Sequence, residues 1–202
     1  ITPPVRVRVL DGGGNVVTTA TTSITLSIGT NPGGSTLGGT TTVSASSGIA
    51  QFNALSLNRS GTGYTLAAAA TGLTGATSAA FDITPAAASA LAFTVQPGTT
   101  VAGVAIAPAV QVEVRDALGN RVTTSTASIT MAIGTNPGGS TLGGTATVNA
   151  VAGVATFSTL SLNRSGVGYT LSASSGGLTS AISAGFTVDP GAASALAITT
   201  MP

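Results

Sequence analysis

Residues 110–115 read Val-Gln-Val-Glu-Val-Arg, and residues 116–120 continue with Asp-Ala-Leu-Gly-Asn. In the first stretch, apolar and polar side chains alternate with the period of two that is typical of a strand with one buried face. We therefore expect Val110, Val112 and Val114 to line a core. The second stretch predicts a tight turn, because Asp, Gly and Asn favour turn conformations. A strand ending in such a turn is a basic unit of an all-β protein.

The composition of the whole chain agrees with many short strands. The 202 residues are rich in Thr, Ser, Ala and Val, with 28 Gly, and only 5% are charged. The net charge of +1 offers no basic patch for phosphates, so no nucleic acid partner is expected. The most apolar stretch, residues 101–114, is interrupted by Gly103 and Pro108, so no membrane insertion is expected either.

A long internal repeat organises the chain. Residues 29–40, GTNPGGSTLGGT, recur unchanged as residues 134–145, at an offset of 105 residues. The same offset maps Tyr64 onto Tyr169 without insertion or deletion. The two copies are therefore expected to share one fold. The expected domains are residues 1–88, which lack their own first strand, residues 89–193, which are complete, and a further strand over residues 194–202.

Strand signals in the second copy are spaced as in a β-sandwich. About seven strands are expected, separated by turns, which is the number in an immunoglobulin-like domain. These strands are predicted at residues 91–95, 110–115, 129–133, 145–150, 153–162, 169–174 and 182–188. The predicted fold class is all-β, with two tandem immunoglobulin-like β-sandwich domains.

Several motifs resemble those of a known group of proteins. In Ser165-Gly-Val-Gly-Tyr169, a Tyr opens the penultimate predicted strand, like the tyrosine corner of immunoglobulin-type sandwiches. Together with the Asp-x-x-Gly-Asn turn and residues 91–97 (LAFTVQP), this resembles the immunoglobulin-like tandem repeats of large bacterial surface proteins, including invasin-type and intimin-type adhesins. The resemblance implies an extracellular, cell-surface location. It leaves the role open, because such repeats occur as stalks, adhesive tips, filament subunits and spacers beside secreted enzymes.

Catalytic chemistry has few candidate residues in this sequence. The chain has no His, Cys or Lys, and its five acidic residues do not form a pair at the same place in both copies. A Ser or Thr nucleophile would therefore have no neighbouring base. No catalytic residues, no cofactor and no enzymatic activity are expected.

The remaining motifs include candidate ligand and modification sites. Asp82 and Asp189 each stand alone near the end of a copy, whereas calcium is usually held by several carboxylates, so no metal site is expected. Residues 134–145 lack the Lys and the helix of a phosphate-binding loop, and are expected to be a structural loop or a neutral contact loop. Asn58 and Asn163 begin Asn-x-Ser sequons and are candidate glycosylation positions.

The two ends of the sequence show a second relationship. Ile1 aligns with Ile106, so the first copy lacks a counterpart of residues 91–105. Residues 195–202 (ALAITTMP) align with residues 90–97 (ALAFTVQP) and form an additional opening strand. Two explanations stand side by side. The chain is a window cut from a longer covalent array, or its last strand is donated to the first domain of the next copy by β-augmentation.

Both explanations predict the same contact residues. Leu196 and Ile198 match Leu91 and Phe93, and they form the donor face. The acceptor is the edge of the first domain, at the strand whose inward side chains are Val5, Val7 and Val9.

The leading functional hypothesis is a structural repeat of an extracellular filament or cell-surface stalk, in which copies of the chain are partners arranged head to tail. A nearly uncharged surface of Thr, Ser and Gly permits close packing with little charge repulsion. One alternative is an adhesive or glycan-binding module, which would be favoured by an exposed aromatic side chain. The other is a spacer in a secreted multidomain enzyme.

Overall fold

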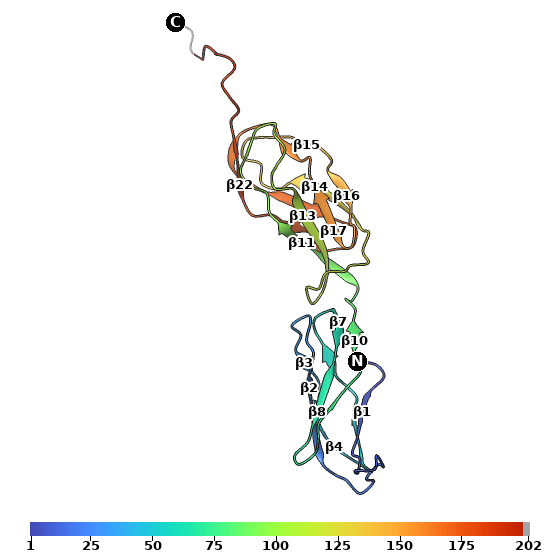
Figure 1. Ribbon diagram of the computed structural model, residues 1–202. Coiled ribbons are helices and arrows are strands. Elements are labelled where there is room, and N and C mark those ends of the chain that lie inside the picture. The colour runs from blue at the N-terminus through green and yellow to red at the C-terminus, as the bar shows by residue number, and fades with distance from the viewer. Residues whose placement is uncertain (200–202) are drawn as a thin grey trace. The chain divides into compact units, whose positions relative to one another are not determined.

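The computed structural model describes residues 1–199, and those residues form strands and turns but no helix. The chain divides into two compact units, Ile1–Pro85 and a second that begins at Ala86 (Figure 1). The expected boundary lay between residues 88 and 89. The all-β, immunoglobulin-like fold class expected from the sequence is confirmed.

The second unit is built from twelve short strands within residues 86–199. Three sheets of three or four strands enclose its core, with orders β11-β13-β17, β12-β22-β19 and β16-β14-β20-β21, and a two-stranded sheet joins β15 to β18. The strands are β11 (Ala88–Val95), β12 (Thr100–Val101), β13 (Val110–Asp116), β14 (Ser128–Ile133), β15 (Leu142–Gly143), β16 (Thr147–Asn149), β17 (Val154–Phe157), β18 (Ser161–Leu162), β19 (Gly166–Tyr169), β20 (Leu171–Ser174), β21 (Ala181–Ile182) and β22 (Phe186–Asp189).

Three of the predicted strands are each two strands in the structure. The prediction of one strand over residues 169–174 is wrong, because Tyr169 ends β19 and Leu171 begins β20, and these belong to different sheets. The chain crosses between sheets again from β21 to β22, within the predicted strand at residues 182–188. The predicted strand at residues 153–162 divides into β17 and β18. Alternation continues through such crossings, so the sequence pattern does not reveal them.

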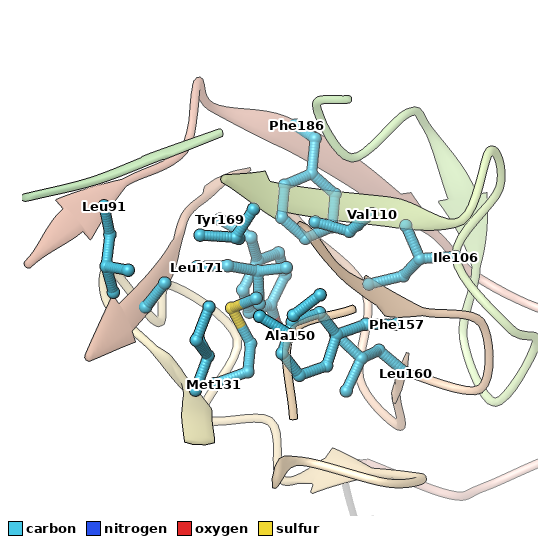
Figure 2. Close-up of a cluster of buried hydrophobic side chains, with 14 of the residues drawn as sticks. Leu91, Ile106, Val110, Met131, Ala150, Phe157, Leu160, Tyr169, Leu171 and Phe186 are labelled. Atoms are coloured by element: carbon cyan, nitrogen blue, oxygen red, sulfur yellow. The ribbon is translucent and has the colours of Figure 1, made fainter. Parts of the chain in front are cut away.

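The core of the second unit follows the alternation in its longest strands. Val110, Val112 and Val114 of β13 are fully buried, as their spacing predicts. They pack with aromatic and aliphatic side chains from the other sheets, including Phe157 and Tyr169 (Figure 2). The core is therefore aliphatic with a few aromatic rings, and it needs neither a disulfide nor a Trp.

The first unit repeats this design with fewer strands. Each three-stranded sheet of the second unit has a two-stranded counterpart, β1-β5 and β10-β7, beside the sheets β4-β2-β8-β9 and β3-β6. Among the described residues of this unit, none takes the places of β11 and β12. The strands are β1 (Val5–Arg8), β2 (Ser23–Ile28), β3 (Leu37–Gly38), β4 (Thr42–Ser44), β5 (Ile49–Phe52), β6 (Ser56–Leu57), β7 (Gly61–Tyr64), β8 (Leu66–Ala69), β9 (Ala76–Thr77) and β10 (Phe81–Ile83).

Candidate functional site

Strand β11 connects two sheets of the second unit. It pairs with β13 in antiparallel register, so that Leu91 faces Val114 and Phe93 faces Val112. At its start it also bonds to the chain just before β21. There Leu91 N–H donates to the Thr179 carbonyl and Thr179 N–H donates to the Ser89 carbonyl, both at 2.9 Å. The strand thereby closes the side of the sandwich between β13 and β21.

A groove lies at the corresponding place in the first unit. It consists of two adjoining hollows of about 470 and 530 Å³, which run along β1 and along the segment from Ala68 to Ser78. Both hollows are lined by Val7, Leu10 and Ala76. Since β1 is the counterpart of β13 and β9 that of β21, the groove occupies the position that β11 fills in the second unit.

The exposure of matched residues outlines the same position. Leu73 is 44% exposed, whereas its counterpart Leu178 packs against the core of the second unit. Ser78 is exposed, whereas Ser183 is only 7% exposed. Leu178 precedes Thr179, which bonds to β11, and Ala184, after Ser183, donates to the Gln96 side chain just beyond the strand. The first unit therefore presents, on its surface, side chains that the second unit covers with a strand.

The turn after β1 carries the same difference. Asp116 and Asn120 are buried in the second unit, whereas Asp11 and Asn15 are exposed in the first. Residues just before β11 cover this turn in the second unit, where Ala86 N–H donates to Asp116 Oδ2 at 3.0 Å.

The C-terminal segment carries the pattern of β11, but its described part, up to residue 199, forms no strand. Residues 190–199 lack regular secondary structure, and Leu196 and Ile198 are fully or almost fully exposed, the latter at 90%. The rest of the predicted strand, residues 200–202, lies outside the described residues. Two large apolar side chains, separated by one residue, are thus accessible to a partner.

The predicted acceptor residues line the groove. Val5 and Val7 are half-buried and Val9 is 6% exposed, and all three contribute to the walls. Sequence reasoning did not identify the opposite wall, which includes Leu73, Thr74 and Ala76. Thr74 is the counterpart of Thr179, the residue that bonds to β11. The 105-residue offset maps Thr179 onto Thr74, but it indicates a role for Thr74 only when the hydrogen-bond partners of β11 are known.

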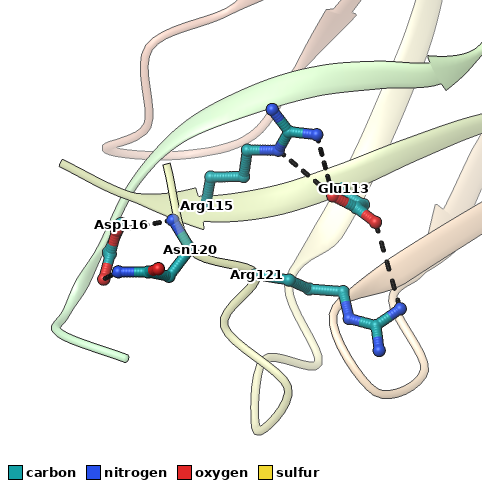
Figure 3. A network of polar contacts seen from close by, with 5 residues as sticks. All are labelled: Glu113, Arg115, Asp116, Asn120 and Arg121. Atoms are coloured by element: carbon teal, nitrogen blue, oxygen red, sulfur yellow. Dashed lines mark hydrogen bonds and ion pairs between the residues drawn. The ribbon is translucent and has the colours of Figure 1, made fainter. Parts of the chain in front are cut away.

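Charges near the groove differ between the two units. In the second unit, Glu113 pairs with Arg115 at 3.0 Å and with Arg121 at 3.9 Å on the outer side of β13 (Figure 3). At the matching positions the first unit has Arg8, Leu10 and Val16. Leu10 is 49% exposed and extends the apolar surface of the groove.

The sequon residues hold the Gly-rich loops in place. Asn163 Oδ1 accepts hydrogen bonds from Ser140 Oγ at 2.9 Å and from Thr141 N–H at 2.8 Å. Asn58 makes the matching bonds to Ser35 and Thr36. Through these hydrogen bonds, each carboxamide holds its loop against the turn in which the Asn lies. Their modification state stays a prediction.

The remaining acidic candidates have separate surroundings. Asp82 Oδ1 accepts a hydrogen bond from Gly63 N–H at 2.9 Å, while Asp189 is exposed at the end of β22. Within residues 1–199 no group of three or more acidic, His or Cys side chains is placed to hold a metal ion. The same part of the chain contains no helix long and apolar enough to span a membrane.

Aromatic side chains are part of the two cores. Tyr64 and Tyr169 are fully buried, and each lies near a Phe ring, Phe81 and Phe186 respectively, at centroid distances of 6.2 and 6.1 Å. The five Phe and two Tyr all lie within the described residues, and each is buried or half-buried. The described surface therefore presents no exposed aromatic ring on which a sugar would stack.

No protein-family model matches the chain, and no curated protein is similar in sequence. The chain is similar to parts of larger solved structures. A β-glycosidase from Bacteroides vulgatus is 12% identical, with a TM-score of 0.41 over 84% of this chain and 21% of that one. The adhesin InvE of Yersinia pseudotuberculosis is 18% identical, with a TM-score of 0.36 over 92% and 53%. Domains 4–9 of the surface layer protein SbsC are 15% identical, with a TM-score of 0.34 over 94% and 25%. The chain thus spans about a fifth of the glycosidase, a quarter of the surface layer protein and half of the adhesin.

Proposed function

We propose that this chain is a structural repeat module of an extracellular filament or cell-surface stalk, and that its copies join head to tail by strand donation. The C-terminal segment of one copy, residues 194–202, enters the groove of the first unit of the next copy. The observation that carries this proposal is the pairing of β11 with β13, since it is an intramolecular example of the proposed joint.

The donor and the groove match in chemistry. In the register of β11, Leu196 faces Val9 and Ile198 faces Val7. Ala195 and Ala197 place only small side chains on the opposite face of the strand, as Ala90 and Ala92 do in the second unit. Main-chain hydrogen bonds to β1 and to Thr74 would then hold the strand on both sides, which is the usual basis of β-augmentation.

Burial of the donor face supplies part of the free energy of the joint, and main-chain hydrogen bonds supply the rest. Burial of Leu196 and Ile198 contributes about 3 to 6 kcal/mol, at roughly 1.5 to 3 kcal/mol for each side chain. That range is comparable to much of the stability of a small domain, about 5 to 15 kcal/mol. The strand therefore adds a substantial part of the first unit's core, and a chain of such joints is a heterologous, open assembly.

The proposal is tested by changing the donor face in the full chain. The double variant Leu196→Asp, Ile198→Asp places charges where the groove is apolar, so it should remain monomeric. The unaltered chain should form filaments. Negative-stain electron microscopy and analytical ultracentrifugation measure both outcomes.

A matched control introduces the same charges elsewhere. Val151→Asp with Val167→Asp alters two side chains that are 77% and 78% exposed and lie away from the tail in sequence. This control should assemble like the unaltered chain. Filaments of normal length from the Leu196→Asp, Ile198→Asp chain would show that strand donation is wrong.

A further inference from the structure

The start of β11 is held by a carboxylate as well as by sheet bonds. Asp116 Oδ1 accepts the amides of Leu118 and Asn120, both at 2.9 Å, which fixes the turn after β13. Asp116 Oδ2 accepts Asn120 Nδ2 at 2.9 Å and, from outside the turn, Ala86 N–H at 3.0 Å. Ala86 lies two residues before β11 begins. The turn therefore fixes where the strand starts along β13.

The first unit contains the same carboxylate in the same local arrangement. Asp11 Oδ1 accepts the amides of Gly13 at 2.9 Å and Asn15 at 2.8 Å, and Oδ2 accepts Asn15 Nδ2 at 3.1 Å. Asp11 is exposed. Its orientation is thus set by its own turn before any strand arrives, so no conformational change is needed to receive a donor amide.

We infer that Asp11 sets the register of the donated strand, by accepting at Oδ2 the N–H of Gly191 from a second copy of this chain. This inference rests on the proposed strand donation. The residue is identified by the offset of 105, which maps Ala86 onto Gly191 and Asp116 onto Asp11. The same register brings the Ser194 hydroxyl to the Leu10 carbonyl, as the Ser89 hydroxyl lies 3.4 Å from the Arg115 carbonyl.

A register-setting contact is needed because alternation alone does not define the register. A slip of one residue would turn Leu196 and Ile198 away from Val7 and Val9, which disfavours it. A slip of two residues keeps every side chain on its own face. Besides the fit of Leu196 and Ile198, a contact at a fixed point along the strand separates that register from the native one, and the charged acceptor Asp11 provides it at the strand's start.

Cysteine trapping measures the register directly. The chain contains no Cys, so only introduced thiols can link. Ala90 pairs with Arg115 in the second unit, which predicts that Ala195 pairs with Leu10 between copies. A Leu10→Cys chain that also carries Leu196→Asp and Ile198→Asp serves as acceptor, and peptides of residues 189–202 with Cys at 193, 195 or 197 serve as donors. The disulfide should form with position 195, because paired Cα atoms lie within bonding range and residues two positions away do not.

Binding of the same peptide without Cys measures the contribution of Asp11. Gly191→Ala reproduces Ala86 and should bind within about twofold of the unaltered peptide, since Ala86 carries a Cβ at the matching position and still donates to Asp116. Gly191→Pro removes the donor N–H and should bind about 10- to 100-fold more weakly, as for loss of a hydrogen bond to a charged group. In an Asp11→Ala acceptor, the two peptides should bind alike, which assigns the effect to this pair.

The outcomes separate this inference from the proposed function. Equal binding of the Gly191→Ala and Gly191→Pro peptides to the Asp11 acceptor, or equal linking at positions 193, 195 and 197, would overturn the role of Asp11 and leave strand donation intact. Failure of every peptide to bind would instead overturn strand donation itself.

Discussion

The hydroxyl of Tyr169 donates a hydrogen bond to the carbonyl oxygen of Arg164, five residues earlier, at 2.9 Å. Tyr64 makes the identical bond to Arg59 in the first unit. Each Tyr is fully buried and closes the corner that precedes its strand. This arrangement is the tyrosine corner implied by the sequence resemblance.

Replacing the phenol tests the corner. Tyr169→Phe keeps the ring but leaves the Arg164 carbonyl without this donor, so the free energy of unfolding of the second unit should fall by about 1 kcal/mol. Urea denaturation followed by circular dichroism measures the change. Val167→Ala, two residues away on an exposed side chain, should change stability by less than about 0.5 kcal/mol. Equal effects of the two substitutions would contradict a specific role for the hydroxyl.

The identical Gly-rich loops should depend on the same corner. A Cβ at Gly138 would collide with Tyr169 Oη and with the Ser165 carbonyl. Gly138→Ala should therefore destabilise the second unit by about 1 to 3 kcal/mol, as overpacking does. Gly176→Ala is the control, because a Cβ there meets open space. If both variants unfold at the same urea concentration, packing against Tyr169 does not explain the loop's sequence.

Much of this fold follows from local pattern, and much of the site does not. The alternation in residues 110–115 predicted which Val side chains are buried, and the repeat predicted that the two units match. The crossings at Thr170 and before Phe186 were not predictable, because a strand that changes sheets keeps its alternation. The wall formed by Leu73 and Thr74 was missed for a different reason. Its role depends on a strand that is distant in sequence, and the residues of the wall do not indicate which sheet edge that strand pairs with.

Acid should destabilise the second unit through Asp116. Burial raises the pKa of this carboxyl, but hydrogen bonds from Asn120 and from the amides of Ala86 and Leu118 outweigh burial, so its pKa lies below the usual value of 3.8. The folded unit therefore favours the ionised form. Its contribution is fully present above the unfolded pKa and is lost as pH falls through the lower folded pKa.

This pH dependence is measurable by urea unfolding between pH 7 and pH 2. The unaltered chain should lose stability below about pH 5, where unfolded Asp begins to bind protons. Asp116→Asn should be less stable at pH 7 and should lose less on acidification. An unchanged slope in the variant would assign the acid sensitivity to other carboxyls.

Hydrogen exchange provides a test of the groove that does not depend on filament formation. The full-length Leu196→Asp, Ile198→Asp chain keeps both units and provides an acceptor without a competing donor face. Added peptide of residues 189–202 binds only the folded first unit under the proposed function, so it should stabilise that unit by mass action, by about 2.7 kcal/mol at 100 times the dissociation constant. Amide exchange should slow in β1 and in residues 68–78.

The second unit serves as the internal control in the same sample. Its own β11 already occupies the matching position and buries Leu91 against β13, so exchange in β13 should not change. A peptide carrying Leu196→Asp should protect neither unit, because it places a carboxylate against Val9. Equal slowing in β1 and β13 would indicate nonspecific association, and no slowing in β1 would show that the groove does not accept this strand.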